Sequence, residues 1–204
     1  RRNNGLISII KNSHINWYAF SDAGIADDVK LLSEIADAGC TQLLIGFESL
    51  CSENLQGLNE NHWKMKKLDS YKEIIKRIQS FGIGIVGSFV VGMENDTANV
   101  FDNLYEFIEE TSLYATNITV LTPFPGTETY EKFKREGRLI SEDWSVYNGF
   151  ELTFKPDNMT IEEFEKGYMD LNMQFNSTDR MNRIIEHFKM VFTNKNLGVS
   201  KTLI

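Results

Sequence analysis

Apolar and polar positions follow two alternating patterns through the first two thirds of the chain. Short apolar runs with little polar alternation are typical of strands buried on both faces, and they occupy residues 15–20, 42–47, 83–91 and 115–121. Segments with apolar residues at helical spacing follow these runs, at residues 27–39, 69–81, 97–111 and 127–136. Because each strand is joined to the next through a helix, the pattern predicts right-handed βαβ units, a parallel sheet and the α/β fold class.

Residues 82–97, GIGIVGSFVVGMENDT, form the most informative stretch. Its apolar run predicts a central strand, and Gly84, Gly87 and Ser88 would leave room beside that strand for another backbone or a flat ligand. Ligand sites of α/β proteins lie in the loops that follow the carboxyl ends of strands. We therefore expect residues 92–96 to lie where the chemistry of this protein takes place.

Capping residues mark the starts of two predicted helices. Asp96 or Thr97 is expected to cap the third of the helices above, because Asp and Thr side chains accept hydrogen bonds from the first free N–H groups of a helix. Thr160 followed by Glu163 is a capping box. This pair predicts a further helix over residues 161–176.

The strand–helix alternation stops after Gly137. Residues 138–156 are expected to wrap over the sheet and to contribute a short strand at residues 152–154. A last helix is predicted over residues 178–192. The first 14 residues allow either a helix or a short strand.

Composition narrows the class of protein. The chain has 204 residues, of which 42% are hydrophobic and 25% are charged, as in a globular protein. No stretch approaches the roughly 18 apolar residues of a membrane span. The net charge of −8 argues against a nucleic-acid binder, which usually carries a basic face. Cys40 and Cys51 are too few for a disulfide framework or a closed metal site, and with no signal peptide we expect a cytoplasmic location.

Five segments in a fixed order point to a known family. They read GCTQLLIGFES, GIGIVGSFVVGMENDT, LTPFPGTETYEKFKREGRL, DWSVYNGFELTFKP and MTIEEFEKGY. Together they resemble the carboxyl-terminal part of radical S-adenosylmethionine (SAM) enzymes, over roughly residues 15–180. The resemblance is to the cobalamin-binding subgroup, which includes magnesium-protoporphyrin monomethyl ester cyclases and hopanoid methylases.

The resemblance implies a partial (β/α) barrel of parallel strands, the second half of a radical SAM barrel, with a carboxyl-terminal helical extension. Residues 1–137 would form the barrel half, and residues 138–204 the wrapping segment and the last helices. The family's CxxxCxxC motif, whose thiolates hold a 4Fe–4S cluster, is absent. Cys40 and Cys51 lie eleven positions apart and cannot replace it. We therefore expect neither a catalytic residue nor a metal ligand in this chain, and no activity from it alone.

The resemblance also implies how the chain would contact SAM. Glu48 and Ser49 would hold the ribose or the methionine part, although Glu48 could instead cap a helix or form an ion pair at the rim. Glu94 is either a ligand contact or a charge at a helix terminus. The other residues expected at the adenine are Gly87, Val90, Val91, Gly92, Leu121 and Thr122.

Residues after the first strand are candidates for the substrate. Tyr18, Ser21 and Asp22 could face it, although core packing is as plausible for Tyr18 and for Phe20. Cys51 is expected to be an inert loop cysteine. Packing is the expected role of three residues in the carboxyl-terminal part, Trp144, Tyr147 and Met159.

The leading hypothesis is a cobalamin-dependent radical SAM enzyme of which this chain is the carboxyl-terminal part. Its substrate would be a small molecule of the lipid, hopanoid or tetrapyrrole kind, and the reaction a methylation or an oxidative cyclisation; the sequence does not distinguish these. The alternatives are a radical SAM enzyme without cobalamin and a binding or scaffold module without a cluster. The last would require the gene to begin near Arg1.

The predicted sheet also has a physical consequence. Four parallel strands cannot close a barrel, so an edge and an apolar face should be left open. We expect self-association, or the chain's own amino-terminal residues or carboxyl-terminal helices, to cover them.

Overall fold

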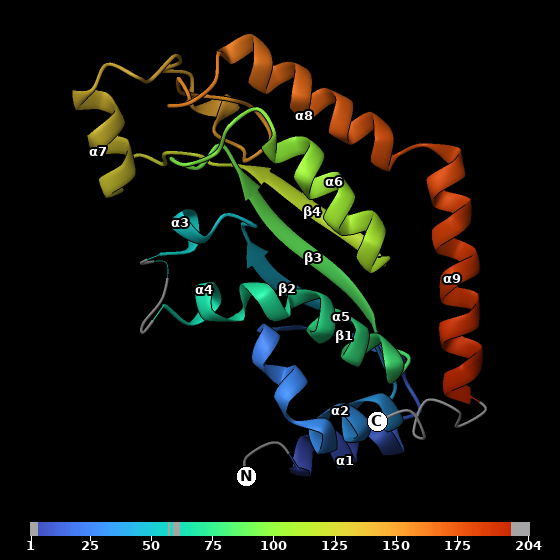
Figure 1. The fold of residues 1–204 in the computed structure, drawn as a ribbon. Helices are drawn as coiled ribbons and strands as arrows, with labels where there is room; N and C mark the ends of the chain where they lie inside the picture. The colour runs from blue at the N-terminus through green and yellow to red at the C-terminus, as the bar shows by residue number, and fades with distance from the viewer. Residues whose placement is uncertain (1–3, 57, 59–61, 197–204) are drawn as a thin grey trace.

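The computed structural model describes residues 4–56, 58 and 62–196. These residues form one sheet of four parallel strands in the order β1-β2-β3-β4 (Figure 1). The strands are β1 (Trp17–Ser21), β2 (Cys40–Glu48), β3 (Gly84–Val91) and β4 (Ala115–Val120). The sequence prediction of an α/β protein with a partial parallel barrel is confirmed.

Helices connect the strands as the sequence pattern predicts. The segment between β1 and β2 holds η1 (Ala23–Asp27) and α2 (Val29–Asp37), and the segment between β2 and β3 holds α3 (Ser52–Leu55), α4 (Trp63–Lys67), η3 (Leu68–Ser70) and α5 (Tyr71–Ser80). Helix α6 (Val100–Thr111) joins β3 to β4, and α7 (Glu128–Arg135) follows β4. Helix α1 (Asn4–Asn12) precedes β1, so the first of the described residues are helical. The remaining elements are η4 (Trp144–Val146), α8 (Ile161–Phe175) and α9 (Thr178–Asn196).

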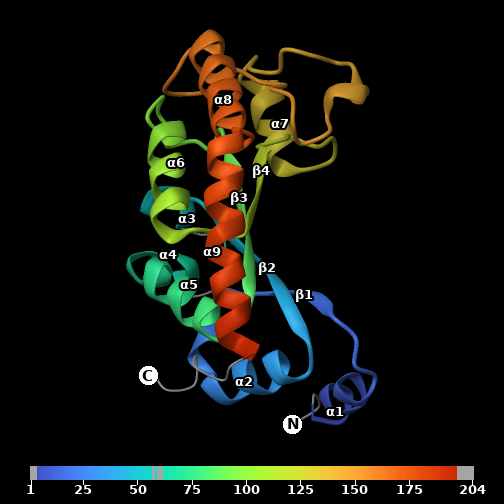
Figure 2. The same cartoon turned by 90° about the vertical axis from the view of Figure 1, so that its right-hand side faces the viewer.

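One face of the sheet carries the core. Helices α2, α5 and α6 lie on this face (Figure 2). Three rings from β2, β3 and α6 meet here: Phe47 stacks on Phe89 with 5.5 Å between ring centroids, and Phe107 meets both edge-on. Such aromatic contacts add to the burial of apolar area, which is the main favourable term in folding. The covered face therefore holds the sheet and its helices together.

The opposite face of the sheet is open. Strand β1 directs Tyr18 and Phe20 to this face, and their side chains are 70% and 75% exposed. Core packing of these two aromatic residues is therefore a wrong expectation. Half-buried Leu44 is in register with Phe20, and Val86 with Leu44. Val90 lies on the same face, further along β3. An apolar face without cover is what a partial barrel leaves.

The carboxyl-terminal helices do not close this face. Arg180 and Arg183 of α9 form ion pairs with Glu109 of α6, at 2.7 and 2.5 Å. The ring of Phe188 packs edge-on against Tyr114, next to the start of β4. Helices α8 and α9 thus pack on the side of α6 and α5 (Figures 1 and 2). The expectation that they cover the open face is wrong, while self-association stays a prediction.

The predicted helix cap is present at α8 but not at α6. Thr160 and Glu163 form the predicted capping box: Thr160 Oγ1 accepts from Glu163 N–H at 3.1 Å, and Glu163 Oε2 accepts from Thr160 N–H at 2.8 Å. Helix α6, in contrast, begins only at Val100, after Asn99, whose side chain makes no capping bond. The prediction that Asp96 or Thr97 caps this helix is wrong, because Asp96 binds elsewhere.

The segment after α7 returns to the sheet edge, where the carbonyl oxygen of Gly149 accepts from Val120 N–H at 2.7 Å. It forms only an isolated bridge between Leu139 and Phe154, so the strand predicted at residues 152–154 is wrong. Tyr147 is 8% exposed and Met159 packs on the core, as expected for packing residues. Trp144 is 66% exposed, so the packing role predicted for it is wrong.

We expect His187 on α9 to make stability depend on pH. Burial lowers the pKa of His187 below its ordinary 6.5, and its Nε2 atom has no hydrogen-bond partner among the described residues. Because the folded-state pKa is depressed, this contribution to stability is complete above pH 6.5 and is lost as the pH falls through the folded-state pKa. Urea unfolding between about pH 7 and pH 5 should show the wild type losing more stability than His187→Gln.

The control for this experiment is His14→Gln, because His14 lies exposed just after α1. This variant should keep the pH dependence of the wild type. An unchanged dependence in His187→Gln would contradict the role of His187.

Candidate functional site

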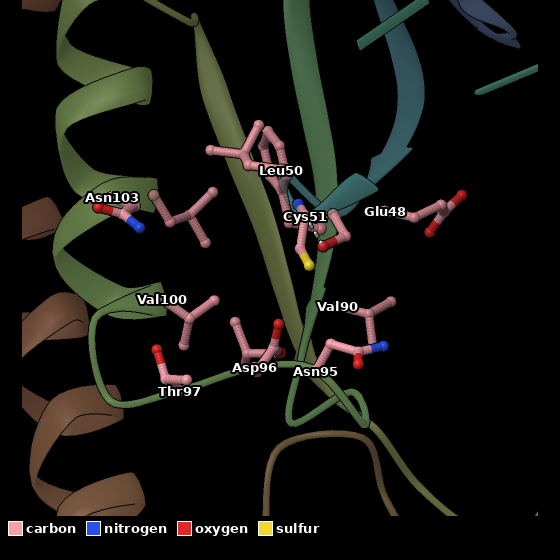
Figure 3. Close-up of a pocket in the computed structure, with 13 residues that line it drawn as sticks. Glu48, Leu50, Cys51, Val90, Asn95, Asp96, Thr97, Val100 and Asn103 are labelled. Atoms are coloured by element: carbon pink, nitrogen blue, oxygen red, sulfur yellow. Dashed lines mark hydrogen bonds between the residues drawn. The ribbon is translucent and has the colours of Figure 1, made fainter. Parts of the chain in front are cut away.

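A cavity of about 220 Å³ lies at the carboxyl ends of β2 and β3, next to the start of α6 (Figure 3). We call it the β2–β3 cavity. The sequence predicted a site in this place, because loops after parallel strands meet at one edge of the sheet. Its lining residues come from three segments: Glu48, Ser49, Leu50 and Cys51 after β2; Phe89, Val90, Val91, Asn95, Asp96 and Thr97 from β3 and its loop; and Val100, Asn103 and Leu104 from α6.

Glu48 ends β2 in an unusual backbone conformation. Its φ of +68° lies in the left-handed region, which a residue with a Cβ seldom adopts. Its carboxylate forms an ion pair with Lys64 Nζ at 2.5 Å, and Lys64 also donates to the carbonyl oxygen of Gly46 at 2.9 Å. A Cβ at Gly46 would come too close to the Glu48 carboxylate, which would have to move away. The rim ion pair, one of the two alternatives for Glu48, is therefore present.

A buried hydrogen-bond network joins the loop after β2 to the loop after β3. Asp96, which is 3% exposed, accepts from the backbone N–H groups of Gly92 and Met93 at 2.8 and 2.9 Å and from Asn54 Nδ2 at 2.6 Å. Asn54 Oδ1 accepts from the backbone N–H of Asn95 at 2.9 Å. Asn54 and Asp96 are 42 positions apart in the chain. They hold the two sides of the cavity together.

Burial raises the pKa of the Asp96 carboxyl above its ordinary value, and the three donors oppose this rise. Each of these donors favours the ionised carboxylate. The network therefore offsets part of the cost of burying a charge at the edge of the sheet.

Ser49 belongs to the same network. It is 4% exposed, and its Oγ accepts from the backbone N–H of Cys51 at 3.0 Å. The Cys51 thiol donates a hydrogen bond to the Glu53 carboxylate at 3.2 Å. The pKa of the thiol is raised, mainly by burial and also by this contact. A raised pKa keeps the thiol protonated and unreactive, in line with the inert role expected of Cys51.

The walls of the β2–β3 cavity are mixed in character. In Figure 3, Leu50 and Val100 present apolar groups, while Asn103 and Asn95 bring amide groups from opposite sides. Amide groups can donate and accept hydrogen bonds. Such a cavity can hold and orient part of a polar organic ligand, but it contains no activated nucleophile.

Val90 and Val91, also predicted to contact SAM, line the cavity, whereas Gly87, Gly92, Glu94, Leu121 and Thr122 lie outside its lining. Gly92 has a φ of +88°, and a Cβ there would meet the rings of Phe154 and Phe164. Glu94 forms an ion pair with Lys132 of α7. Helix α6 begins only at Val100, so Glu94 is not a charge in the first turn of that helix.

Gly87 lies on the covered face of the sheet. A Cβ there would come within 2.7 Å of Leu113, and one at Gly84 within 3.0 Å of Tyr114. Side chains of the chain itself, rather than a ligand, therefore occupy the room expected beside these glycines. Ser88 lies on the other face.

Leu121 and Thr122 continue the sheet edge beyond β4. The N–H of Leu121 donates to Val91 at 2.8 Å, and the hydroxyl of Thr122 donates to the carbonyl of Val120 at 3.0 Å. The Leu121 N–H is therefore already engaged, and the carbonyl oxygen of Thr122 already accepts from Phe124 N–H at 2.9 Å.

The substrate candidates lie on β1 and directly after it, away from the cavity lining. Tyr18 is exposed on the open face, Ser21 donates to the carbonyl oxygen of Asp22 at 3.2 Å, and Asp22 accepts from Gly24 N–H at 2.7 Å as the cap of η1. Asp22 therefore has a structural partner already.

The chain's cysteines do not fit an iron–sulfur cluster. Cys40 begins β2 and is buried, whereas Cys51 follows the end of the same strand. The length of β2 separates them, while a 4Fe–4S cluster needs clustered thiolates. Within the described ranges, no three His, Cys, Asp or Glu residues are placed to hold a metal ion. Helices long and apolar enough to cross a membrane are also not found among these residues.

The fold and the site define an α/β protein with an incomplete parallel barrel and a ligand cavity at the carboxyl ends of its strands. No family model matches the chain. It is 28% identical over 151 residues to the bacteriochlorophyllide d C-8(2)-methyltransferase of Chlorobaculum tepidum, covering 74% of this chain and 33% of that protein.

Two further relatives have other names. The hopanoid C-2 methylase of Rhodopseudomonas palustris is 27% identical over 119 residues, 58% of this chain and 22% of that protein. The anaerobic magnesium-protoporphyrin IX monomethyl ester cyclase of Rubrivivax gelatinosus is 23% identical over 171 residues, 84% of this chain and 27% of that protein. These relatives confirm the resemblance to the cobalamin-binding subgroup of radical SAM enzymes. The chain spans about a third of the length of the first relatives it matches.

Sequence reasoning missed three polar residues of this site. Asn54 and Lys64 lie in the polar connection after β2, and Asn103 lies on α6. Their partners are distant along the chain, and one sequence offers no signal that pairs them. A weak local signal exists at Asn54, because an amide side chain in a helical turn often bonds to nearby backbone groups.

Proposed function

We propose that this chain is part of a radical SAM enzyme, dependent on cobalamin, in which SAM lies at the carboxyl ends of β2, β3 and β4. The supporting observation is that relatives named as methyltransferases, a methylase and cyclases share most of this chain, and that the chain has a cavity at this edge of the sheet. Sites at the carboxyl ends of parallel strands are the rule in barrels.

The residues of the cavity have chemistry suited to parts of SAM. The Glu48 carboxylate can accept hydrogen bonds from ribose hydroxyls or from the methionine ammonium group. Val90 and Val91 offer apolar contact to a flat base, and the carbonyl groups of Leu121 and Thr122 can accept from an exocyclic amino group. In this proposal the network of Asn54 and Asp96 keeps these groups in place.

The iron–sulfur cluster is a separate matter, because the two cysteines of this chain do not fit it. Its ligands would lie on residues outside this chain, and so would a cobalamin-binding domain. This chain would therefore contribute binding and orientation, and it would be inactive alone. Because a reduced cluster needs a reducing compartment, the proposal places the enzyme in the cytoplasm.

The proposed substrate is a small, largely apolar molecule of the lipid or tetrapyrrole kind. The open face supports this proposal, since Tyr18 and Phe20 present exposed rings there. Apolar rings exposed on an open sheet face are suited to cover a flat or extended apolar molecule. The reaction would be a methylation or an oxidative cyclisation.

The test uses the full-length protein, purified without oxygen, with its cluster reconstituted and reduced. We expect it to cleave SAM to 5′-deoxyadenosine and methionine, measured by chromatography. Dependence of substrate turnover on added cobalamin would separate the proposal from a radical SAM enzyme without cobalamin. A full-length protein that binds neither cluster nor SAM would overturn it in favour of a binding module.

We also propose that the isolated 204-residue chain self-associates through its open face. Burying exposed rings such as Tyr18 and Phe20 is favourable at roughly 25 cal/mol per Å², so light scattering should give a mass above the 23.4 kDa of one chain. Phe20→Glu should return the mass to that of a monomer, because a charge cannot be buried in the contact.

The control for the association experiment is Val29→Glu, because Val29 is 40% exposed on α2, away from the open face. This variant should associate like the wild type. A wild type that stays monomeric at the highest concentration reached would contradict the proposal.

A further inference from the structure

A second cavity lies among aromatic residues of the segment that follows β4. It measures about 280 Å³ and is lined by Pro125, Tyr130, Glu142, Trp144 and Tyr147. We call it the Trp144 cavity. It shares no residue with the β2–β3 cavity, and neither the relatives nor the proposed function assigns it a role.

The segment that carries Trp144 is held by its own hydrogen bonds. Asp143 accepts from Ser145 N–H at 2.9 Å and caps η4. Tyr147, 8% exposed, donates its hydroxyl to the carbonyl oxygen of Ser141 at 2.7 Å. The Trp144 ring stands 6.4 Å from the Tyr147 ring, with 35° between the ring planes. A wall fixed in this way loses little freedom when a ligand binds.

The lining combines three aromatic rings with one carboxylate and has no basic side chain. The faces of aromatic rings attract cations, and Trp attracts them most strongly. Glu142 is exposed, and no ion pair of the described residues involves it. Burial is the main cause that raises the pKa of the Tyr147 hydroxyl. The nearby charges of Tyr130 and Glu142 raise this pKa further. The cavity therefore has the polarity that favours a positive ligand.

Two further observations agree with a cationic ligand. Trp144 leaves 66% of its surface exposed, which a packing role does not explain. Lys134 Nζ lies 5.9 Å from the centroid of the Tyr130 ring, so the Trp144 and Tyr147 rings, rather than Tyr130, are left for a cationic ligand. An anion would meet the Glu142 charge and the net charge of −8 of the chain.

We propose that the Trp144 cavity binds a small organic cation of the alkylammonium class, with the cationic group against the Trp144 ring and beside the Glu142 carboxylate. The apolar groups of such a cation suit the rings, and its charge suits the carboxylate. A metal ion is a poorer match, because it needs several oxygen ligands and the cavity offers a single carboxylate.

The experiment follows the indole N–H signals in the NMR spectrum of the 204-residue chain during titration with choline. The chain has three tryptophans, and Trp144→Phe assigns the signal of interest. We expect the Trp144 signal to shift and to saturate, while the signals of Trp17 and Trp63 stay in place. The neutral isostere of choline, with carbon in place of nitrogen, should cause no saturable shift.

Two variants test the residues. The variants Trp144→Leu and Glu142→Gln should each weaken choline binding by about threefold or more. Binding to Trp144→Leu is followed through the NMR signals of other residues of the cavity. Glu151→Gln, an exposed acid of the same segment outside the cavity, should bind like the wild type. Because the changed side chains are exposed, the rest of the spectrum should be preserved, and this verifies folding.

Three outcomes would overturn the proposal. One is the absence of a saturable shift at Trp144. Another is an equal response to the neutral isostere, which would mean that only apolar contact matters. The third is a response of all three indoles alike, which would indicate non-specific association.

Discussion

Replacing Asp96 by alanine is expected to lower the free energy of unfolding by roughly 3 kcal/mol. The carboxylate of Asp96 is almost fully buried and accepts three hydrogen bonds, from Gly92, Met93 and Asn54. Its removal leaves two backbone N–H groups and one amide without an acceptor, and each buried donor without a partner costs free energy. Urea unfolding of the variant and of the wild type measures the difference.

Two further variants make this experiment specific. Asp102→Ala removes an exposed carboxylate of α6 and should change stability by no more than about 0.5 kcal/mol. Asp96→Asn should fall between the two, because its single oxygen can serve the backbone donors while its NH₂ group opposes the amide of Asn54. A loss below about 1 kcal/mol in Asp96→Ala would show that the loops hold together without this network.

Replacing Glu48 by glycine is expected to separate stability from function. Glycine adopts the left-handed conformation of this position at no steric cost, whereas Glu48 holds a φ of +68°. Relief of this strain is worth roughly 1 kcal/mol, and loss of the partly buried ion pair with Lys64 costs about as much. We therefore expect the unfolding free energy to stay nearly the same.

The activity should respond differently. In the full-length, reduced protein, Glu48→Gly should lower SAM cleavage by roughly 100-fold, because misplacing a bound ligand by a small distance has effects of this size. A strained residue at a ligand cavity is itself a reason to suspect a function, since glycine would adopt this conformation without strain. Formation of 5′-deoxyadenosine per unit time is the measurement.

The matched control is Glu106→Ala, an exposed acid of α6 outside the cavity, which should cleave SAM at the wild-type rate. Glu48→Gln tests whether charge is needed, because the amide keeps one acceptor but loses the negative charge. Undiminished cleavage by Glu48→Gly would remove Glu48 from the proposed SAM contacts and leave its ion pair with Lys64 as its role.

Local features of the chain were predictable because their causes are local. The four strands and the helices between them follow from apolar spacing, which records the faces that must be buried. The capping box at Thr160 involves a partner only three residues away. The resemblance to radical SAM enzymes likewise rests on contiguous motifs, and the relatives confirm it.

Predictions failed where the partner of a residue is distant in sequence. Asp96 looked like a helix cap, but its carboxylate turns back to Gly92 and Met93 and reaches Asn54 across two loops. The sequence left core packing and a substrate-facing position open for Phe20, because its exposure depends on which face of β1 receives helices.

The sequence by itself thus determined the order and type of the elements, the parallel sheet and the family to which the motifs point, because periodicity and short motifs encode these directly. Only the tertiary structure decided which residues line the β2–β3 cavity, which face of the sheet stays open, and that Trp144 stands exposed beside Glu142. The physical reason is that burial and hydrogen bonding depend on segments brought together from distant parts of the chain. A side chain's role is settled by those neighbours rather than by its own position.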